Sequence, residues 1–274
     1  MIAPLLLLLM SVSLLAQYNL VHVSSFSTYE AASLVIGQTS LTSESLSGGQ
    51  NGLSGPNAAA FDSSGNLWVA DSSNNRVLEF TPPFTDGEDA SVVIGQSSFT
   101  ANSGVTNSST LDHPTGLAFD HSGDLWVVDN ENNRVVEYVP GTSGCSSGQL
   151  CTGMVASLVI GQSLFTTHGT ATTQKGLNGP TGVAFDSSGN MWIADANNAR
   201  VLEFTTPFST DEAAGLVIGQ SSFTALALAT TQTGCIFLRL LHSTLREICG
   251  YQITVTTGSS STHLPSQLAK QRVW

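Results

Sequence analysis

A segment of 58 residues recurs along this chain, and this period constrains the fold more than any other feature of the sequence. The tetrapeptide Val-Ile-Gly-Gln occurs four times, with steps of 58, 66 and 58 residues, ending at Gln38, Gln96, Gln162 and Gln220. A longer motif recurs between these tetrapeptides, at 55–80, 113–138 and 179–204. The eight additional residues of the long step fall in the loop GTSGCSSGQLCTG. A fixed period of this kind indicates one structural unit that is copied along the chain.

Each unit contains four short β-rich runs separated by turn residues. In the first unit these runs are 57–61, 67–70, 77–80 and 91–94. The residues Asp-Ser-Ser-Gly-Asn at 62–66 are typical of a tight hairpin turn, in which glycine takes a positive φ. Four antiparallel strands per repeated unit predict a blade of a β-propeller, whereas a β-sandwich is not expected to keep a fixed period. We therefore expect an all-β fold of three complete four-stranded antiparallel blades and a partial one, a fragment of a larger propeller.

The repeated motif resembles the NHL repeat. Its first strand reads Pro-x-Gly-x-Ala-Phe-Asp, its hairpin Gly-Asn-Leu-Trp-Val-Ala-Asp, and its third strand Asn-Asn-Arg-Val-x-Glu-Phe. The resemblance covers about residues 26–233, and the three copies agree with one another. The first copy departs from the others at Asn57 and Ala58, and the third departs at Ala199. The resemblance implies a propeller that serves either as a binding module or as a metal-dependent lyase or lactonase.

The sequence divides into three regions. The apolar segment 1–16 has the length of the hydrophobic part of a secretory signal peptide, and it is shorter than the ~20 residues of a membrane span. We therefore expect an extracellular or cell-surface protein, with a membrane anchor as the alternative. The propeller blades occupy 26–233. The tail, 234–274, has no repeat and holds four of the eight Lys and Arg residues. We interpret it as non-repeat sequence that is out of frame, so a non-functional gene fragment is a further alternative.

The net charge and the cysteine content indicate which partners the protein binds and in which compartment it resides. The formal net charge is −12, and the repeat region is strongly acidic, so we expect no nucleic-acid partner. An incomplete propeller leaves open blade edges, which predicts self-association. Cys145 and Cys151 share one loop and are expected to form a disulfide in an oxidising compartment. A zinc site there is disfavoured because two cysteines with no nearby histidine cannot complete a tetrahedral shell.

Several polar and aromatic side chains recur at the repeat period. A residue that recurs in every unit usually serves the unit itself, so we interpret these positions as structural. The tryptophans are expected between blades, the aspartates are expected to accept backbone N–H bonds within the Asn-rich turns, and the arginines are expected to brace the adjacent strands. These positions are Trp68, Trp126, Trp192, Asp71, Asp129, Asp195, Arg76, Arg134 and Arg200.

The loops that join successive blades are the candidate binding surface. The loops at 97–112 and 163–178 are long and rich in Ser, Thr, Asn and Gly, and loops of this length in compact domains are usually functional or mobile. In an up-and-down meander they share a face with the Asn-rich turns. We expect this face to bind a protein or glycan through Asn74, Asn75, Asn132, Asn133, His113 and His168.

A catalytic role is the rival hypothesis. His113 and His168 supply half of a zinc site, but loop histidines are common without a metal. The first strand of each blade is small and apolar at 58–60, 116–118 and 182–184, where an enzyme of this fold needs polar residues. We therefore expect no catalytic residue, metal or cofactor.

Overall fold

A computed structural model of the protein describes residues 31–44 and 46–226. The chain divides into two compact units, 1–33 and 34–274, and every element below belongs to the second unit. The expected signal segment at 1–16 and the tail at 234–274 lie outside the described residues. The described residues include no apolar helix of membrane-spanning length.

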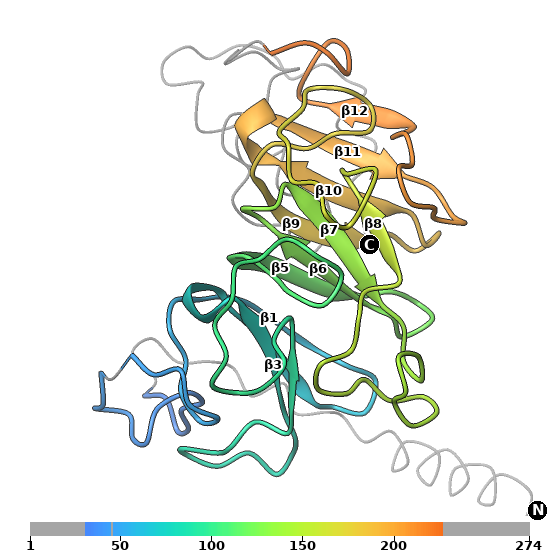
Figure 1. Ribbon diagram of the computed structural model, residues 1–274. Helices are drawn as coiled ribbons and strands as arrows, with labels where there is room; N and C mark the ends of the chain where they lie inside the picture. The colour runs from blue at the N-terminus through green and yellow to red at the C-terminus, as the bar shows by residue number, and fades with distance from the viewer. Residues whose placement is uncertain (1–30, 45, 227–274) are drawn as a thin grey trace, which may run out of the picture. The chain divides into compact units, whose positions relative to one another are not determined.

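The fold is all-β and consists of three four-stranded antiparallel blades, as predicted (Figure 1). In every blade the strands lie side by side in chain order. The first blade comprises β1 (Pro56–Phe61), β2 (Leu67–Asp71), β3 (Arg76–Phe80) and β4 (Val92–Ile94). The second comprises β5 (Pro114–Phe119), β6 (Leu125–Asp129), β7 (Arg134–Tyr138) and β8 (Leu158–Ile160). The third comprises β9 (Pro180–Phe185), β10 (Met191–Asp195), β11 (Arg200–Phe204) and β12 (Leu216–Ile218).

Local turn chemistry accounts for the first hairpin of each blade. In the first blade, the Asp62 carboxylate accepts hydrogen bonds from the backbone N–H groups of Ser64 (2.8 Å) and Asn66 (3.0 Å). Gly65 has a φ of +84°, the left-handed conformation that the sequence predicts for the glycine of this turn. The same aspartate also accepts from the indole Nε1 of Trp68 at 3.1 Å. The turn is therefore tied to the core residue of its own blade.

The partial fourth blade is not formed as a sheet within the described residues. No strand is present at 34–36, the segment that is equivalent to β4 of the first blade, and β1 is the first strand of the described part of the chain. In the complete blades this outermost strand pairs only with the third strand, as β4 pairs with β3. The corresponding partner segment would be 18–22, which lies outside the described residues.

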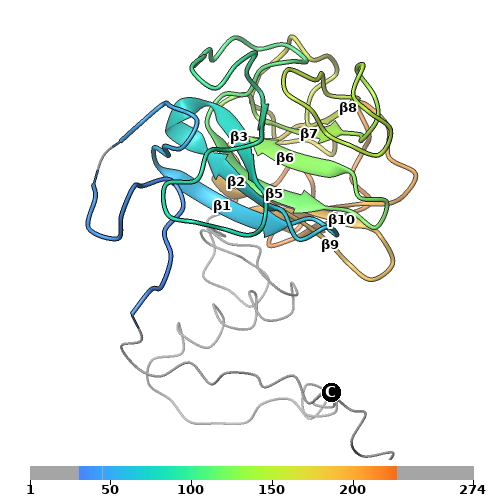
Figure 2. The ribbon, with the colours of Figure 1, turned by 90° about the horizontal axis from the view of Figure 1, so that it is seen from below.

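The first strands of successive blades, β1, β5 and β9, lie next to one another (Figure 2). The Val-Ile-Gly-Gln strands β4, β8 and β12 form the opposite edges of their sheets. Gly116 of β5 shows how closely the first strands approach. A Cβ atom at this position would lie 3.1 Å from the Cα of Gly182 in β9. A side chain at position 116 would therefore crowd the neighbouring blade, whereas the first blade carries Ala58 at the equivalent position.

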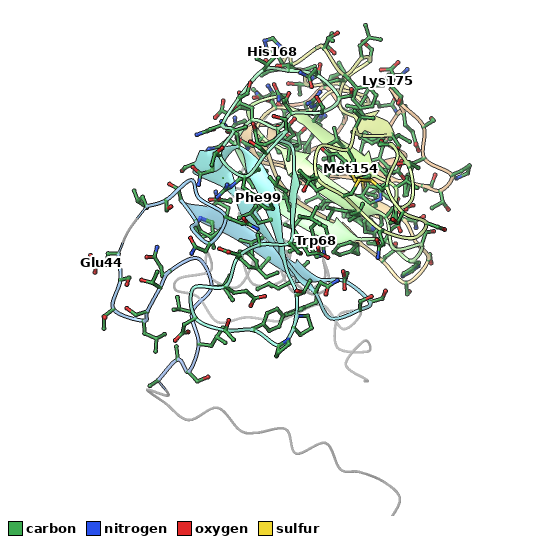
Figure 3. The ribbon with its side chains drawn as sticks, turned by 60° about the horizontal axis from the view of Figure 1, so that its bottom comes forward. Glu44, Trp68, Phe99, Met154, His168 and Lys175 are labelled. Atoms are coloured by element: carbon green, nitrogen blue, oxygen red, sulfur yellow. A yellow bond between two sulfur atoms is a disulfide. The ribbon has the colours of Figure 1, made fainter. Side chains whose placement is uncertain are left out.

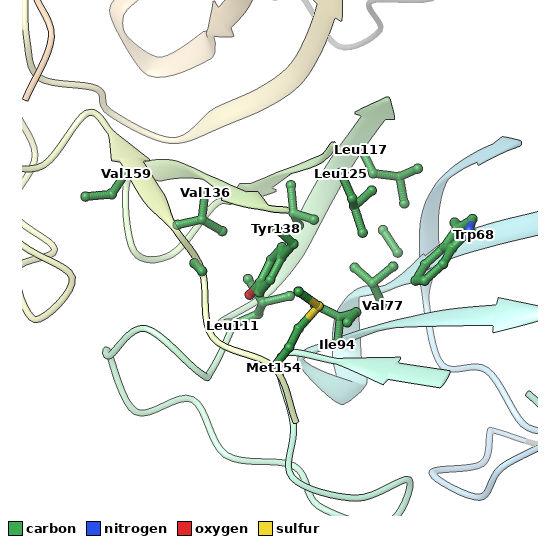
Figure 4. Packing of buried hydrophobic residues seen from close by; sticks show 13 residues of the cluster. Trp68, Val77, Ile94, Leu111, Leu117, Leu125, Val136, Tyr138, Met154 and Val159 are labelled. Carbon is green, nitrogen blue, oxygen red and sulfur yellow. The ribbon is translucent and has the colours of Figure 1, made fainter. Parts of the chain in front are cut away.

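The hydrophobic core lies between blades. Trp68 of the first blade packs into a buried cluster with Leu117, Leu125 and Tyr138 of the second blade (Figure 4). Its ring meets Phe119 edge-on, with centroids 5.9 Å apart. Trp126 takes the same place in the next junction, 5.9 Å from Phe185. Trp68 and Trp126 are fully buried, and Trp192 of the third blade is half-buried.

Truncation of a junction residue should destabilise the protein, whereas truncation of a loop leucine should not. Leu125 is 0% exposed and Leu164 is 60% exposed. We expect Leu125→Ala to lower the free energy of unfolding by ~2–5 kcal/mol, because it leaves a cavity between blades. Leu164→Ala should change it by less than ~0.5 kcal/mol. Urea melts of the two variants measure this difference, and similar midpoints would contradict the placement of the core.

Candidate functional site

A buried ion pair lies at the turn between the second and third strands of every blade. The aspartate that ends the second strand pairs in register with the arginine that begins the third, as Asp71 pairs with Arg76. The Nε···Oδ2 distances are 2.7 Å, 2.6 Å and 2.6 Å, for Asp71–Arg76, Asp129–Arg134 and Asp195–Arg200. All six side chains are at most 1% exposed. Charges buried this deeply need further partners.

The arginine finds these partners on two different loops. The Arg76 Nη2 donates to the carbonyls of Gly49 (2.9 Å) and Gly52 (2.8 Å) in the loop that precedes the blade. Its Nη1 donates to the carbonyl of Phe99, in the loop that follows the blade. Arg134 and Arg200 repeat this arrangement in their own blades. Each guanidinium therefore fixes two of the long loops at once.

The aspartate completes the same cluster. The Asp71 Oδ1 accepts from the backbone N–H of Ser54 at 2.6 Å, and its Oδ2 accepts from the Asn74 side chain at 2.9 Å. The carboxylate thus bonds to the chain just before the first strand, 17 residues upstream, and not to a backbone N–H of the turn itself. We call each set of aspartate, arginine and bonded loop carbonyls a loop knot.

The four asparagines expected to contact a partner are used inside the structure. Asn74, Asn132 and Asn133 are 8%, 2% and 8% exposed. The Asn75 Oδ1 accepts from the backbone N–H of His113 (2.8 Å), and Asn132 donates to the Asp129 of its own knot (2.9 Å). The Asn133 side chain donates to the carbonyl of His168 (3.0 Å). These side chains form hydrogen bonds with the loops and with the knot residues, so their polar groups are directed to the protein itself.

The two histidines lie near one acidic residue. His113 is half-buried with a φ of +54°, and His168 is exposed (Figure 3). Burial and the neighbouring Glu131 raise the pKa of Asp112, and both histidines oppose this effect. In the described part of the chain, carboxylates with metal-ligand spacing occur elsewhere, at Asp120, Asp124 and Glu137. Neither histidine belongs to that group.

The long loops expose aliphatic side chains that the sequence analysis did not single out. Leu41, Leu46, Val105 and Leu164 are 53%, 79%, 62% and 60% exposed. All four lie in loops that precede a first strand and that a loop knot holds in place. The signal that could have found them is an isolated apolar residue inside a segment otherwise rich in Ser, Thr, Asn and Gly. We call the loops 39–55, 97–113 and 163–179 together the loop face.

The opposite ends of the blades carry a carboxylate cluster that differs between copies. In the first blade, the Asn66 side chain donates to both Asp62 (2.8 Å) and Glu79 (3.0 Å) and bridges them. Asn190 forms the same bridge in the third blade. The second blade has Asp124 at this position, and an ionised carboxylate has no hydrogen to donate. Burial, together with Asp124 and Asp120, raises the pKa of Glu137 to about 7.

The predicted disulfide between Cys145 and Cys151 is present, with a Cα–Cα distance of 5.6 Å. It closes the loop between β7 and β8, where the eight additional residues of the second repeat lie. In the meander this loop leaves the sheet at the end opposite the loop face. The disulfide therefore shapes the end of the blade that carries the carboxylates.

Comparison with known families gives this architecture its name. The NHL repeat model matches residues 53–80, 111–138 and 177–204. The chain carries three NHL repeats. Each NHL match runs from the segment before a first strand to the end of a third strand, so it contains the aspartate and the arginine of one loop knot. No curated protein matches the chain by sequence.

Several solved structures are similar to the chain at low identity. A streptogramin B lyase structure is 11% identical with a TM-score of 0.32, and the match covers 54% of this chain and 36% of that one. Virginiamycin B lyase from Staphylococcus aureus is 13% identical with a TM-score of 0.35, covering 62% and 43%. A putative 6-phosphogluconolactonase from Bacteroides uniformis is 15% identical with a TM-score of 0.36, covering 61% and 43%. The chain spans less than half the length of each. Similarity at this level carries no information about activity.

The loop knot of the second NHL repeat should be essential for stability. Arg134→Met removes the cation and leaves the Asp129 carboxylate buried beside an apolar side chain. We expect a loss of ~3–5 kcal/mol in the free energy of unfolding. The control is Lys175→Met, which breaks the Lys175–Asp211 pair, whose side chains are 52% and 41% exposed. It should cost less than ~1 kcal/mol. Denaturant melts compare the two, and equal losses would contradict the role of the knot.

The carboxylate cluster of the second blade should make stability fall with rising pH. Glu137 titrates at about 7 in the folded protein, against an ordinary value of 4.5. Between these values the folded protein binds more protons than the unfolded chain, so the free energy of unfolding decreases as the pH rises through this range.

Asp124→Asn restores the bridging amide of the other two blades and should reduce this dependence, while burial, the largest cause of the raised pKa of Glu137, remains. We expect a gain above pH 7 of less than ~1 kcal/mol, because Glu137 is only half-buried. The reciprocal variant, Asn66→Asp, should strengthen the dependence in the first blade, where burial and Asp62 already raise the pKa of Glu79. Thermal melts at pH 5 and pH 8 measure both effects, and a pH response unchanged in the two variants would refute the assignment.

Proposed function

We propose that this chain is a binding module that engages a protein partner through its loop face. The observation that carries the proposal is the exposure of aliphatic side chains, notably Leu46 at 79% and Val105 at 62%, on loops that are otherwise polar. Contiguous exposed apolar patches rimmed by polar residues mark protein interaction sites, and we infer that these side chains, all on loops of one face, contribute to such a patch. Aliphatic side chains bury area against an apolar protein surface but form no hydrogen bonds with sugar hydroxyls. A protein partner therefore fits these side chains better than a glycan.

The loop knots support this proposal because they hold the loops in place before a partner arrives. Arg134 by itself donates hydrogen bonds to three loop carbonyls. Those of Asn107 and Thr110 belong to the 97–113 loop, and that of Phe165 belongs to the loop that follows it. The Gln96 side chain donates to the carbonyl of Ser103 (2.9 Å) and fixes the same loop at its start. A pre-ordered surface loses less conformational entropy on binding, so more of the contact energy contributes to affinity.

The charge of the loop face indicates which kind of partner surface it would bind. Glu44, Asp112 and Glu131 place negative charge on or beside the loop face, and Lys175 is paired with Asp211. A partner that presents an apolar patch bordered by basic residues would complement this surface, and its association would be accelerated at low salt.

We further propose that the module acts outside the cytoplasm. The disulfide between Cys145 and Cys151 supports this location, since disulfides persist in oxidising compartments. The apolar segment at 1–16 agrees with secretion by its length.

Two matched valines test the location of the binding surface. Val105 on the loop face is 62% exposed, and Val155 in the opposite loop is 41% exposed. The first step isolates from the culture medium a protein that cross-links to the full chain at Leu164. Calorimetry then measures the affinity of this protein for the full chain and for each variant. We expect Val105→Asp to weaken binding by about fivefold to thirtyfold, and Val155→Asp to leave it unchanged.

Equal weakening by both variants, or full affinity in Val105→Asp, would place the interface elsewhere. A glycan array with the full chain provides the second arm of the test. Specific glycan binding that Val105→Asp abolishes would replace the protein partner by a carbohydrate.

A further inference from the structure

The segment that follows the disulfide joins the second blade to the elements that precede it. The backbone N–H of Gly153 donates to the carbonyl of Val93 in β4 (3.3 Å), and the N–H of Val93 donates to the Thr152 hydroxyl (3.2 Å). The N–H of Ala156 donates to the carbonyl of Ser108 (2.8 Å), in the loop between the first two blades. These contacts close the outer edge of the first blade.

The third blade forms the same contacts without a disulfide. The N–H of Asp211 donates to the carbonyl of Val159 (3.4 Å), whose own N–H donates to the Thr210 hydroxyl (3.4 Å). The N–H of Ala214 donates to the carbonyl of Gln174 (2.9 Å). We call these two sets of contacts the latch of the second blade and the latch of the third blade. The two latches form the same bonds but differ in covalent structure.

The latch of the second blade lies in a longer loop than that of the third. The loop between β7 and β8 covers 139–157, whereas the loop between β11 and β12 covers only 205–215. A longer flexible loop loses more conformational entropy when its residues are held in place. The disulfide offsets this cost, because it holds the Cα atoms of Cys145 and Cys151 within 5.6 Å of each other, and Thr152 follows directly.

The latch is anchored in the core, whereas the disulfide is open to solvent. Met154 and Ala156 are 1% and 6% exposed and belong to the buried cluster between the first two blades (Figure 4). Cys145 and Cys151 are only half-buried, and residues 146–149 between them are exposed. Thiol–disulfide exchange requires access of a thiolate to one of the two sulfur atoms. The position of this disulfide provides that access.

We propose that this disulfide is a redox-sensitive device that controls the latch of the second blade. A dithiol reductant breaks the Cys145–Cys151 bond, gives two electrons and two protons to the cysteines and becomes a disulfide itself. The loop then regains its full flexible length, and the latch opens. Val93 loses the partners of its N–H and carbonyl groups, which leaves the outer edge of the first blade free to pair with another strand. The latch of the third blade, which contains no cysteine, stays closed.

Hydrogen exchange of single backbone amides, measured by NMR on the full chain, tests the proposal. After reduction with dithiothreitol, we expect the exchange of the Val93 and Ala156 amides to accelerate on the order of tenfold or more, because the disulfide no longer restricts the open state of the loop. The matched amides of the third latch, those of Val159 and Ala214, should exchange as before. Mass spectrometry after thiol alkylation monitors the reduction, and a disulfide that resists dithiothreitol in the folded protein would contradict the proposal.

A double variant separates this disulfide from the other cysteines of the chain. Dithiothreitol also acts on Cys235 and Cys249, which the variant retains. Replacement of both latch-loop cysteines, Cys145→Ser with Cys151→Ser, should accelerate the exchange of the same two amides without any reductant. Dithiothreitol should then have no further effect on them.

Matched threonine variants separate the latch from a general loss of stability. Thr152→Ala removes one latch bond and should accelerate exchange at Val93 in the oxidised protein, whereas Thr210→Ala should do so only at Val159. Unchanged exchange at Val93 after reduction would overturn the proposal. Equal acceleration at Val93 and Val159 would overturn it as well, because the disulfide would then stabilise the whole fold and not one latch.

Discussion

The buried aspartate–arginine pair is the interaction on which the rest of the structure depends. Burial of two charges is costly, and the cost is offset only when hydrogen bonds satisfy the remaining donors and acceptors. In the first blade, Arg76 achieves this with carbonyls from the loop before the blade and from the loop after it. The pair therefore cannot form in an isolated hairpin. It links the fold of one blade to the loops on both sides, and the same contacts build the loop face.

The blades could be predicted from the sequence because their determinants are local. The turn at 62–66 depends on an aspartate and a glycine within five residues, and the period of the strands is visible without any long-range contact. The burial of the asparagine side chains could not be predicted in this way. The Asn74 amide bonds to the carbonyl of Ser47, 27 residues away, and the Asn133 amide bonds to the carbonyl of His168, 35 residues away. Only the folded loops bring these groups together, so a run of asparagines looks exposed in the sequence but lies inside the structure.

The three NHL repeats act as internal controls for one another. Positions that agree in every copy include those of the loop knots, the inter-blade core and the first hairpin turn, where a side chain must fit neighbours that are themselves repeated. Positions that differ change the chemistry of one blade alone. Asp124 replaces a bridging amide by a third carboxylate, and Thr142 stands where the third blade has Phe208, whose ring lies 5.2 Å from that of Trp126. Both departures can be read from the aligned copies, but their consequences depend on the side chains that face them across the blade.

The eight additional residues of the second blade lie at one end of its strands for a physical reason. At the knot end, every arginine needs carbonyl groups from two loops at fixed positions, so an insertion there would leave buried donors unsatisfied. The opposite end has no such requirement. The backbone N–H of Ser157 donates to the carbonyl of Glu137 at 2.8 Å, just as Ser91 donates to Glu79 in the first blade. The register of the outermost strand is therefore kept despite the additional residues. The scaffold thus accepts a new loop where no knot constrains the chain.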